Sequence, residues 1–257
     1  MNEYDSNRIS DLMNSINIKK VNELELADYF IFNTCHIREK ATQKVYSDIG
    51  KIKKILQNKK IKPVFVLAGC VAQAESSIVF EKSDFVDIVV GPQSYHKLPE
   101  IIKNYEQKQV KVCSTDLNVL EKFDTLNIYK NNYSEISSLI TIQEGCDKFC
   151  KFCVVPYTRG PEFSRSPETI YDEIEMLVKN GTKEIILLGQ NVSSYQNKDI
   201  NLAGLIKKIA LIEDLERIRF TTSHPNDFNK ELIDIFGEEE KLMPQLHLPV
   251  QSGSDKI

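Results

Sequence analysis

Short apolar runs alternate with amphipathic stretches along the first half of the chain. The runs at residues 27–33, 62–69 and 85–90 have the length of buried strands. Apolar residues from Ile37 to Leu56 recur at helical spacing, and this pattern predicts a helix that reaches about Lys60. Further helices are predicted from about Gln73 and over residues 95–104. Alternating strands and helices are typical of a parallel sheet with helical crossovers.

The alternation starts again in the second half. Strands are predicted at residues 139–143, 184–188, 217–221 and 245–249. A helix is predicted over 167–179, because Ser166 can cap it, Pro167 suits its first turn and Gly181 can end it. The intervening segment 117–137 is rich in Asn, Lys and Asp. We therefore expect three parts: a domain at 1–116, a linker at 117–137 and a second domain at 138–257.

Composition narrows the class of protein. The chain has 257 residues, 41% of them apolar, which excludes collagen, coiled coil and a mostly disordered protein. The first ten residues are too polar for a signal peptide, and the longest apolar stretch, 64–72, is too short to span a bilayer. We therefore expect a cytoplasmic protein without a membrane partner.

Charge alone does not indicate a nucleic-acid partner, because 33 Lys and Arg face 37 Asp and Glu, for a net charge of −4. The predicted helix at 37–60 is nevertheless strongly basic. Its positive charges form either a solvated helix face or a surface that neutralises RNA phosphates. The residues are Arg38, Lys40, Lys44, Lys51, Lys53, Lys54, Lys59 and Lys60.

Three of the six cysteines, Cys146, Cys150 and Cys153, lie within eight residues of one another. Their spacing, C-x3-C-x2-C directly after a predicted strand, suits three corners of a cubane iron–sulfur cluster whose fourth iron stays open to a ligand. A structural zinc site is the alternative, but it usually takes four ligands in two pairs. Unligated core cysteines are a third interpretation.

The cysteine loop resembles the signature of the radical S-adenosylmethionine enzymes, and further segments resemble their methylthiotransferase family. The similarity extends over the whole chain and favours the tRNA-modifying branch. The segments are 33–41 (NTCHIREKA), 69–73 (GCVAQ), 154–165 (VVPYTRGPEFSR), 187–192 (LLGQNV), 219–225 (RFTTSHP) and 246–254 (LHLPVQSGS).

The resemblance implies an α/β fold: a flavodoxin-like N-terminal domain without its first strand, followed by a partial radical SAM (β/α) barrel without an RNA-binding module. It implies transfer of a methylthio group to carbon 2 of N(6)-dimethylallyladenosine at position 37 of tRNA, next to the anticodon. S-adenosylmethionine would bind the cluster on Cys146, Cys150 and Cys153, with Phe152 near its adenine. An electron donor is then required, and we expect a monomer.

A second cluster is implied at Cys35 and Cys70. Each of the two follows a predicted parallel strand, so both thiols are expected at the carboxyl edge of one sheet. The family's third cysteine for this cluster has no counterpart in the chain. Cys113 or His36 is a weak substitute, and we expect Cys113 to be structural.

Several further polar residues lie near the reacting centre that the resemblance implies. Arg159 and Arg165 follow the cysteine loop and can bind the cofactor carboxylate or a phosphate, or they are solvated charges. Gln190 ends a predicted strand at the usual active-site edge of a barrel, and it is expected to bind the cofactor. Asn191 is either a site residue or a helix cap, and His224 and His247 are more typical of structural histidines.

Three alternatives remain from the sequence. The substrate can be threonylcarbamoyladenosine or a ribosomal protein, the targets of related methylthiotransferases. The chain can also be an incompetent fragment that binds one cluster without turnover.

Overall fold

The computed structural model describes residues 1–36, 39–57, 59, 62–126, 135–249, 252–254 and 256. The chain divides into two compact units. The N-terminal unit comprises Asn2–Lys130 and Lys148–Gly160. The C-terminal unit comprises Met1, Asn131–Asp147 and Pro161–Ile257. The domain boundaries at 116 and 138 stay a prediction.

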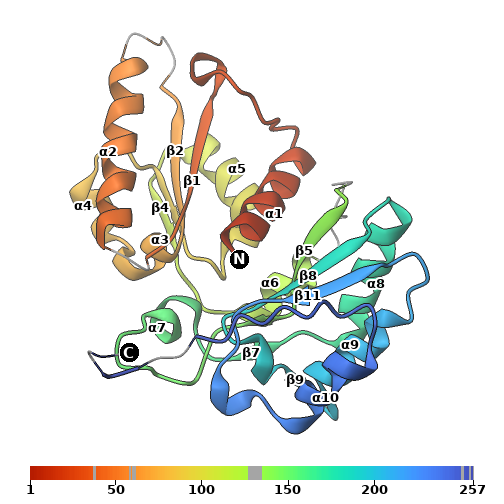
Figure 1. Cartoon of the computed structure of the whole chain (residues 1–257). Coiled ribbons are helices and arrows are strands. Elements are labelled where there is room, and N and C mark those ends of the chain that lie inside the picture. The colour runs from red at the N-terminus through yellow and green to blue at the C-terminus, as the bar shows by residue number, and fades with distance from the viewer. Residues whose placement is uncertain are drawn as a thin grey trace. The chain divides into compact units, whose positions relative to one another are not determined.

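The N-terminal unit is built on a parallel sheet with the order β1-β2-β3-β4. Its strands contain almost only apolar residues, because helices cover both faces of the sheet. The helices α1 and α5 lie on one side, and α2 and α4 lie on the other (Figure 1). The elements are α1 (Asn2–Ser15), β1 (Tyr29–Thr34), α2 (Glu39–Ile55), β2 (Val64–Gly69), α3 (Cys70–Glu75), α4 (Ile78–Lys82), β3 (Ile88–Val90), α5 (Leu98–Lys108), β4 (Val112–Ser114), α6 (Val119–Leu126) and α7 (Val155–Arg159).

Alternation along the strands separates two cores in this unit. Val66 and Ala68 of β2 pack toward α1 and α5, whereas Phe65 and Leu67 pack toward α2 and α3. The segment expected to be a linker contains α6, which buries Phe123 and two further apolar residues.

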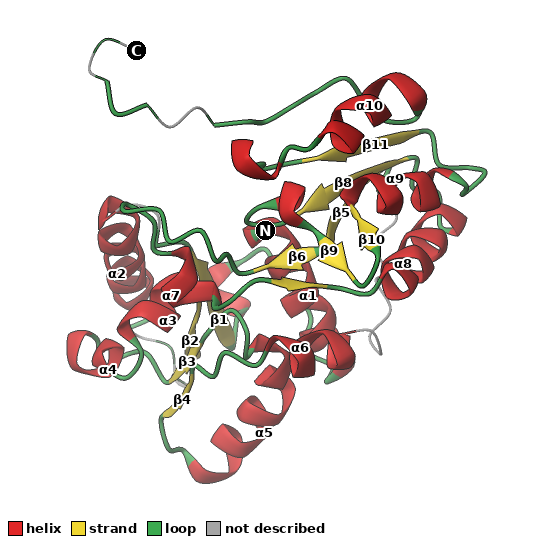
Figure 2. Ribbon diagram, turned by 90° about the horizontal axis from the view of Figure 1, so that it is seen from below, coloured by secondary structure: helices red, strands yellow, loops and turns green. Residues whose placement is uncertain are grey.

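The C-terminal unit contains a parallel sheet with the order β11-β8-β5. Three helices, α8, α9 and α10, supply the apolar residues that pack with the strands in one core (Figure 2). Successive strands joined through helices in this way form part of a (β/α) barrel. The elements are β5 (Ser137–Thr141), β6 (Gln143–Glu144), β7 (Phe163–Ser164), α8 (Pro167–Lys179), β8 (Glu184–Leu188), β9 (Gln196–Asn197), β10 (Ile200–Asn201), α9 (Leu202–Ala210), β11 (Arg217–Phe220) and α10 (Lys230–Glu238).

The α/β class with parallel sheets is confirmed, but the strand predicted at 245–249 is wrong. Residues 245–249 form no strand, and Leu242 makes a single parallel bridge with Ile218 just before them. The amide of Gln245 donates to the Met243 carbonyl at 2.7 Å and so closes a tight turn. Pro244 and Pro249 have no amide to donate to a ladder, which explains why the pairing stops.

Candidate iron–sulfur and substrate site

A glutamine in β6, two residues beyond the end of β5, organises the entrance to the cysteine loop. Gln143 is fully buried, and its Oε1 accepts hydrogen bonds from the amides of Gln190 (2.9 Å) and Asn191 (3.1 Å). Its Nε2 donates to the Gly145 carbonyl at 2.7 Å, and the Gly145 amide donates to Gln190 Oε1 at 2.7 Å. Both backbone groups of Gly145 are therefore held immediately before Cys146.

Two glycines make this arrangement possible. A Cβ on Gly189 would lie 2.6 Å from Gln143 Oε1, so a larger residue would displace the glutamine. Gly145 has a φ of +76°, in the left-handed region that favours glycine. The side-chain amide thus approaches the backbone closely and fixes the direction in which the loop leaves the sheet.

The loop that follows carries three free, half-buried thiols, those of Cys146, Cys150 and Cys153. Residues 145–154 have no regular secondary structure, apart from a turn in which the Cys153 amide donates to the Cys150 carbonyl at 2.8 Å. Phe149 has a φ of +47°, which is uncommon for a residue with a Cβ. Within the part of the chain that the structure describes, no three Cys, His, Asp or Glu side chains are gathered as a metal site.

The thiols fit an iron–sulfur cluster by number and chemistry. Three uncrosslinked cysteines on one irregular loop match a cluster that leaves one iron open, and thiolate is the ligand that iron–sulfur clusters prefer. Metal sites are seldom fully formed before the metal binds, so ungathered thiols are compatible with a site that closes on loading.

Cys35 and Cys70 follow a matched pair of strand ends in the N-terminal unit. Thr34 and Gly69 are register partners in the parallel pair β1 and β2, and each cysteine is the next residue. Thr34 Oγ1 donates to the Ala68 carbonyl at 2.6 Å and accepts from the Val71 amide at 3.2 Å. A Cβ on Gly69, at φ +90°, would lie 2.5 Å from the Thr34 carbonyl oxygen. The sheet therefore places both half-buried cysteines at one edge, as predicted.

Cys113 lies elsewhere on this sheet. It is exposed on β4, where its register partner is Val89 of β3, and its Sγ lies 3.4 Å from Ser76 Oγ. Cys113 thus stands in the interior of its strand pairing rather than at a strand end like Cys35 and Cys70. That placement gives no support to Cys113 as a substitute ligand.

Two protein families match separate parts of the chain. Residues 1–91 match the family described as Uncharacterized protein family UPF0004, and residues 140–257 match the Radical SAM superfamily. The tRNA-2-methylthio-N(6)-dimethylallyladenosine synthase of Pelagibacter ubique is 52% identical over 261 residues, covering 100% of this chain and 58% of the relative. The synthase of Rickettsia typhi is 51% identical, covering 100% of this chain and 60% of the relative. The chain is thus similar to these synthases over its whole length.

The chain spans about three fifths of the length of these curated relatives. Solved structures at 12% identity show the same fold. The cobalamin-dependent S-adenosylmethionine radical enzyme OxsB matches with a TM-score of 0.59, over 98% of this chain and 42% of its own. The radical S-adenosylmethionine methyltransferase TsrM from Kitasatospora setae matches with a TM-score of 0.56, over 86% of this chain and 47% of its own.

The two predicted arginines have partners within the fold. Arg165 is buried, and its guanidinium donates to the Thr141 carbonyl at 2.7 Å and to Glu173 at 2.8 Å. Arg159 is buried as well, and its Nη2 donates to Asp5 Oδ2 at 2.7 Å. Their predicted contacts with cofactor or phosphate stay predictions, and both side chains have structural roles besides.

Two positive charges offset the burial of the Asp5 carboxylate. Burial alone raises the pKa of Asp5, but the positive charges of Arg159 and Lys122 outweigh burial and hold that pKa below its usual value. The carboxylate therefore stays ionised between two buried cations. Lys122 Nζ lies 3.8 Å from Asp5 Oδ1.

Three aromatic residues of the loop region are strongly exposed. Phe152 is 73% exposed, Tyr157 70% and Phe149 62%, and the rings of Phe149 and Tyr157 meet edge to face with centroids 6.3 Å apart. Exposed apolar side chains that lie together mark interaction sites more often than single ones do, and Phe149 and Tyr157 form such a pair. The expected contact of Phe152 with adenine stays a prediction, and the side chain is accessible for it.

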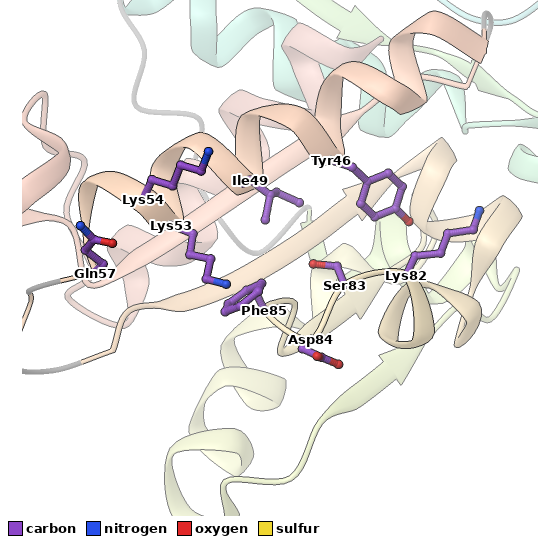
Figure 3. A pocket seen from close by; sticks show the side chains of 10 residues that line it. Tyr46, Ile49, Lys53, Lys54, Gln57, Lys82, Ser83, Asp84 and Phe85 are labelled. Atoms are coloured by element: carbon purple, nitrogen blue, oxygen red, sulfur yellow. The ribbon is translucent and has the colours of Figure 1, made fainter.

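The predicted basic helix corresponds to α2. Its exposed lysines, which we call the α2 lysines, are Lys40, Lys44, Lys51, Lys53 and Lys54. Beside them, a hollow of about 530 Å³ lies between α2 and residues 82–85 (Figure 3). Figure 3 shows Lys53 directed at Phe85, where its Nζ lies 3.6 Å from the ring centroid, whereas Lys54 points away. The lysines therefore spread over a surface and do not converge on one point. Arg38 and Lys60 lie outside the described residues.

Sequence reasoning missed Gln143 at the barrel edge. It named Asn191 as a site residue or a helix cap but did not predict its partners: Asn191 Nδ2 donates to Asp227 at 2.6 Å. Asn191 Oδ1 accepts from Ser193 Oγ and from the His224 amide. The signal for Gln143 was present: a Gln-Glu pair ends an apolar strand and precedes a glycine, and such a polar strand end faces the site of a barrel.

No helix among the described residues is long and apolar enough to cross a membrane.

Proposed function

We propose that this chain carries the radical chemistry of a tRNA methylthiotransferase, which adds a methylthio group to carbon 2 of N(6)-dimethylallyladenosine beside the anticodon. The observation that carries the proposal is identity of about 50% along the entire chain to synthases of that name. The three-cysteine loop at the edge of a partial barrel supports it, because this chemistry requires a cluster with an open iron.

Cys146, Cys150 and Cys153 would hold the first 4Fe–4S cluster, and Cys35 with Cys70 would contribute two thiols to a second cluster. When bound, such a cluster with S-adenosylmethionine supplies radical chemistry that amino-acid side chains do not provide. Gln143 and Gln190 fix the loop entrance through Gly145, so they orient the first thiol. We expect Phe152 to contact the adenine of S-adenosylmethionine.

The N-terminal unit offers two surfaces that suit tRNA. The α2 lysines would neutralise phosphates of the RNA backbone, and the surface beside them is hollowed. Phe149, Phe152 and Tyr157 are exposed and alternate with Lys148 and Lys151 along the loop. Aromatic rings interleaved with basic residues stack on unpaired bases, which an anticodon loop provides. The reaction would take place in the cytoplasm, in a monomer supplied with electrons by a separate donor.

The decisive experiment expresses the gene that encodes this chain in a strain that lacks its own synthase. Mass spectrometry of digested tRNA should then detect the 2-methylthio derivative of dimethylallyladenosine. Alanine at Cys150 or Cys153 should abolish the product, whereas Cys113→Ala should leave it unchanged. Modification of threonylcarbamoyladenosine or of a ribosomal protein, without the expected nucleoside, would contradict the substrate.

Iron counting separates cluster binding from turnover. Anaerobic reconstitution of this chain should load at least one cluster, which the Cys153→Ala variant should lose. Iron retained fully in Cys153→Ala would contradict the placement of the first cluster. Loss of about one half of the iron in the double variant Cys35→Ala/Cys70→Ala would support the second cluster.

A further inference from the structure

The second half of the cysteine loop belongs to the N-terminal unit. Residues 148–160, with Cys150 and Cys153, group with Asn2–Lys130, whereas Cys146 groups with the barrel strands. The segment ends in α7, two residues after Cys153. The residues that hold α7 in place therefore decide where this half of the loop lies.

Three parts of the N-terminal unit, far apart in sequence, hold the end of α7. Arg159 forms its 2.7 Å ion pair with Asp5 of α1, and that carboxylate also faces Lys122 of α6. Gln93, in the connection before α5, donates from Nε2 to the Arg159 carbonyl at 2.9 Å. All four side chains are almost fully buried. A buried ion pair is a strong constraint, because loss of one partner leaves the other charge buried without compensation.

The same short helix also contacts the helix that starts at Cys70. Helix α7 packs against α3, whose first residue is Cys70, and α3 follows β2 directly. Gly160, at φ +82°, then turns the chain beside Leu117. Cys70 and Cys153 are therefore each within two residues of one helix pair, α3 and α7, inside a single unit.

We propose that Asp5 is a positioning residue for the radical SAM loop: through Arg159 it fixes α7, and so places Cys150 and Cys153 relative to Cys70. The inference rests on the proposed function, because it concerns where two of the three proposed ligands of the first cluster lie within the N-terminal unit. It assigns the N-terminal unit a part in assembling the radical centre, in addition to contributing its own two cysteines.

Hydrogen exchange on the full, metal-free chain tests this placement without any cofactor. Asp5→Asn removes the charge and nearly keeps the shape. The amides of Cys153, Tyr157 and Thr158, which are bonded within the segment in the wild type, should exchange about tenfold faster or more. The matched control is Asp11→Asn, on the same helix, where a buried carboxylate pairs with Arg8 at 3.3 Å. It should leave exchange of 148–160 within about twofold of the wild type.

Two results would overturn the proposal. One is unchanged exchange of 148–160 in a folded Asp5→Asn variant, and the other is equal acceleration of that segment by Asp11→Asn. If Asp5→Asn does not fold, Gln93→Met takes its place, because it removes the 2.9 Å bond to the Arg159 carbonyl and keeps a side chain of similar length. Unchanged exchange of 148–160 in that variant would equally refute the placement.

Reconstitution then connects placement with the cluster. After loading, iron should be lost to a chelator several-fold faster from Asp5→Asn than from Asp11→Asn. Equal rates would refute the role in positioning the thiols. A wild-type chain that binds no iron would instead refute the proposed function, while the exchange data would still decide whether Asp5 fixes α7.

Discussion

Replacement of Gln143 by leucine should destabilise the chain more than any single hydrogen bond would suggest. The side chain is fully buried and makes its three shortest hydrogen bonds to backbone groups: the amides of Gln190 and Asn191 and the carbonyl of Gly145. Leucine has similar volume but offers no polar atom. All three backbone groups would then be buried without their partner.

The expected loss follows from these three groups. Each buried donor or acceptor left without a partner costs about 1–3 kcal/mol, so three cost at least about 3 kcal/mol. Burial of the additional apolar surface of leucine returns about 1 kcal/mol. The net loss is therefore about 2 kcal/mol or more. That is a large fraction of the free energy of unfolding of a typical domain, which is about 5–15 kcal/mol.

Urea unfolding of the metal-free chain measures this loss through the midpoint at an unchanged slope. Gln57→Leu, at an exposed position of the same residue type, is the control and should shift stability by less than about 0.5 kcal/mol. Gln190→Met removes only the bond to the Gly145 amide and should cost about 1 kcal/mol. A loss below about 1 kcal/mol for Gln143→Leu would refute the claim that this residue holds the loop entrance.

Three more perturbations test separate parts of the structure. Gly69→Ala should lower the free energy of unfolding by about 1–3 kcal/mol through backbone strain, and further because the new Cβ would lie 2.5 Å from the Thr34 carbonyl oxygen. Gly50 of α2 has open space around it, so Gly50→Ala should instead raise the melting temperature. Burial lowers the pKa of His96 in the folded chain. As the pH falls below about 6.5, the histidine therefore takes up a proton in the unfolded chain before it does so in the folded chain. The free energy of unfolding should then fall by up to about 1.4 kcal/mol per pH unit. His96→Phe should flatten that slope between pH 7 and 5 in urea titrations; an unaltered slope would exclude His96 as its source. Arg165→Met should cost about 3 kcal/mol or more in the metal-free chain, because it breaks a buried ion pair, and unchanged stability would indicate that Arg165 serves ligands alone.

The elements that were predictable from sequence are those whose boundaries have local causes. Helix α8 begins and ends as predicted, because the Ser166 hydroxyl accepts from the Thr169 amide and Pro167 occupies the first turn. Strand β8 also matches the predicted range 184–188. In both elements, the residues that set the limits lie next to them in sequence.

Helix α1 was missed for a physical reason. Its buried side includes Asp5, Arg8 and Asp11 beside apolar residues, so the pattern of hydrophobic positions does not mark the inner face. These charges are inside because their partners come from α6, α7 and the same helix. A partner 154 residues away in sequence leaves no local signal.

The cysteine positions were predictable as strand ends, but the groups that hold the loop were not. Cys35 and Cys70 follow register partners of a parallel pair, and strand ends are visible as the limits of apolar runs. The role of Gln143 depends on the backbone of residues 190–191, which only folding brings near. The spacing of ligands is thus encoded locally, whereas the support of each ligand is a tertiary property.

The two ends of the cysteine loop are held in different ways, and this difference suggests what each end does. Before Cys146, side-chain amides hold Gly145 through neutral hydrogen bonds of 2.7 Å. After Cys153, a buried ion pair at 2.7 Å and a hydrogen bond to the Arg159 carbonyl hold α7. The three thiols between these supports are uncrosslinked and half-buried. Because both supports are made by protein groups alone, we expect the fold to fix the ends of the loop and the cluster to gather its thiols. Loss of either support should therefore weaken cluster retention even where every cysteine is intact.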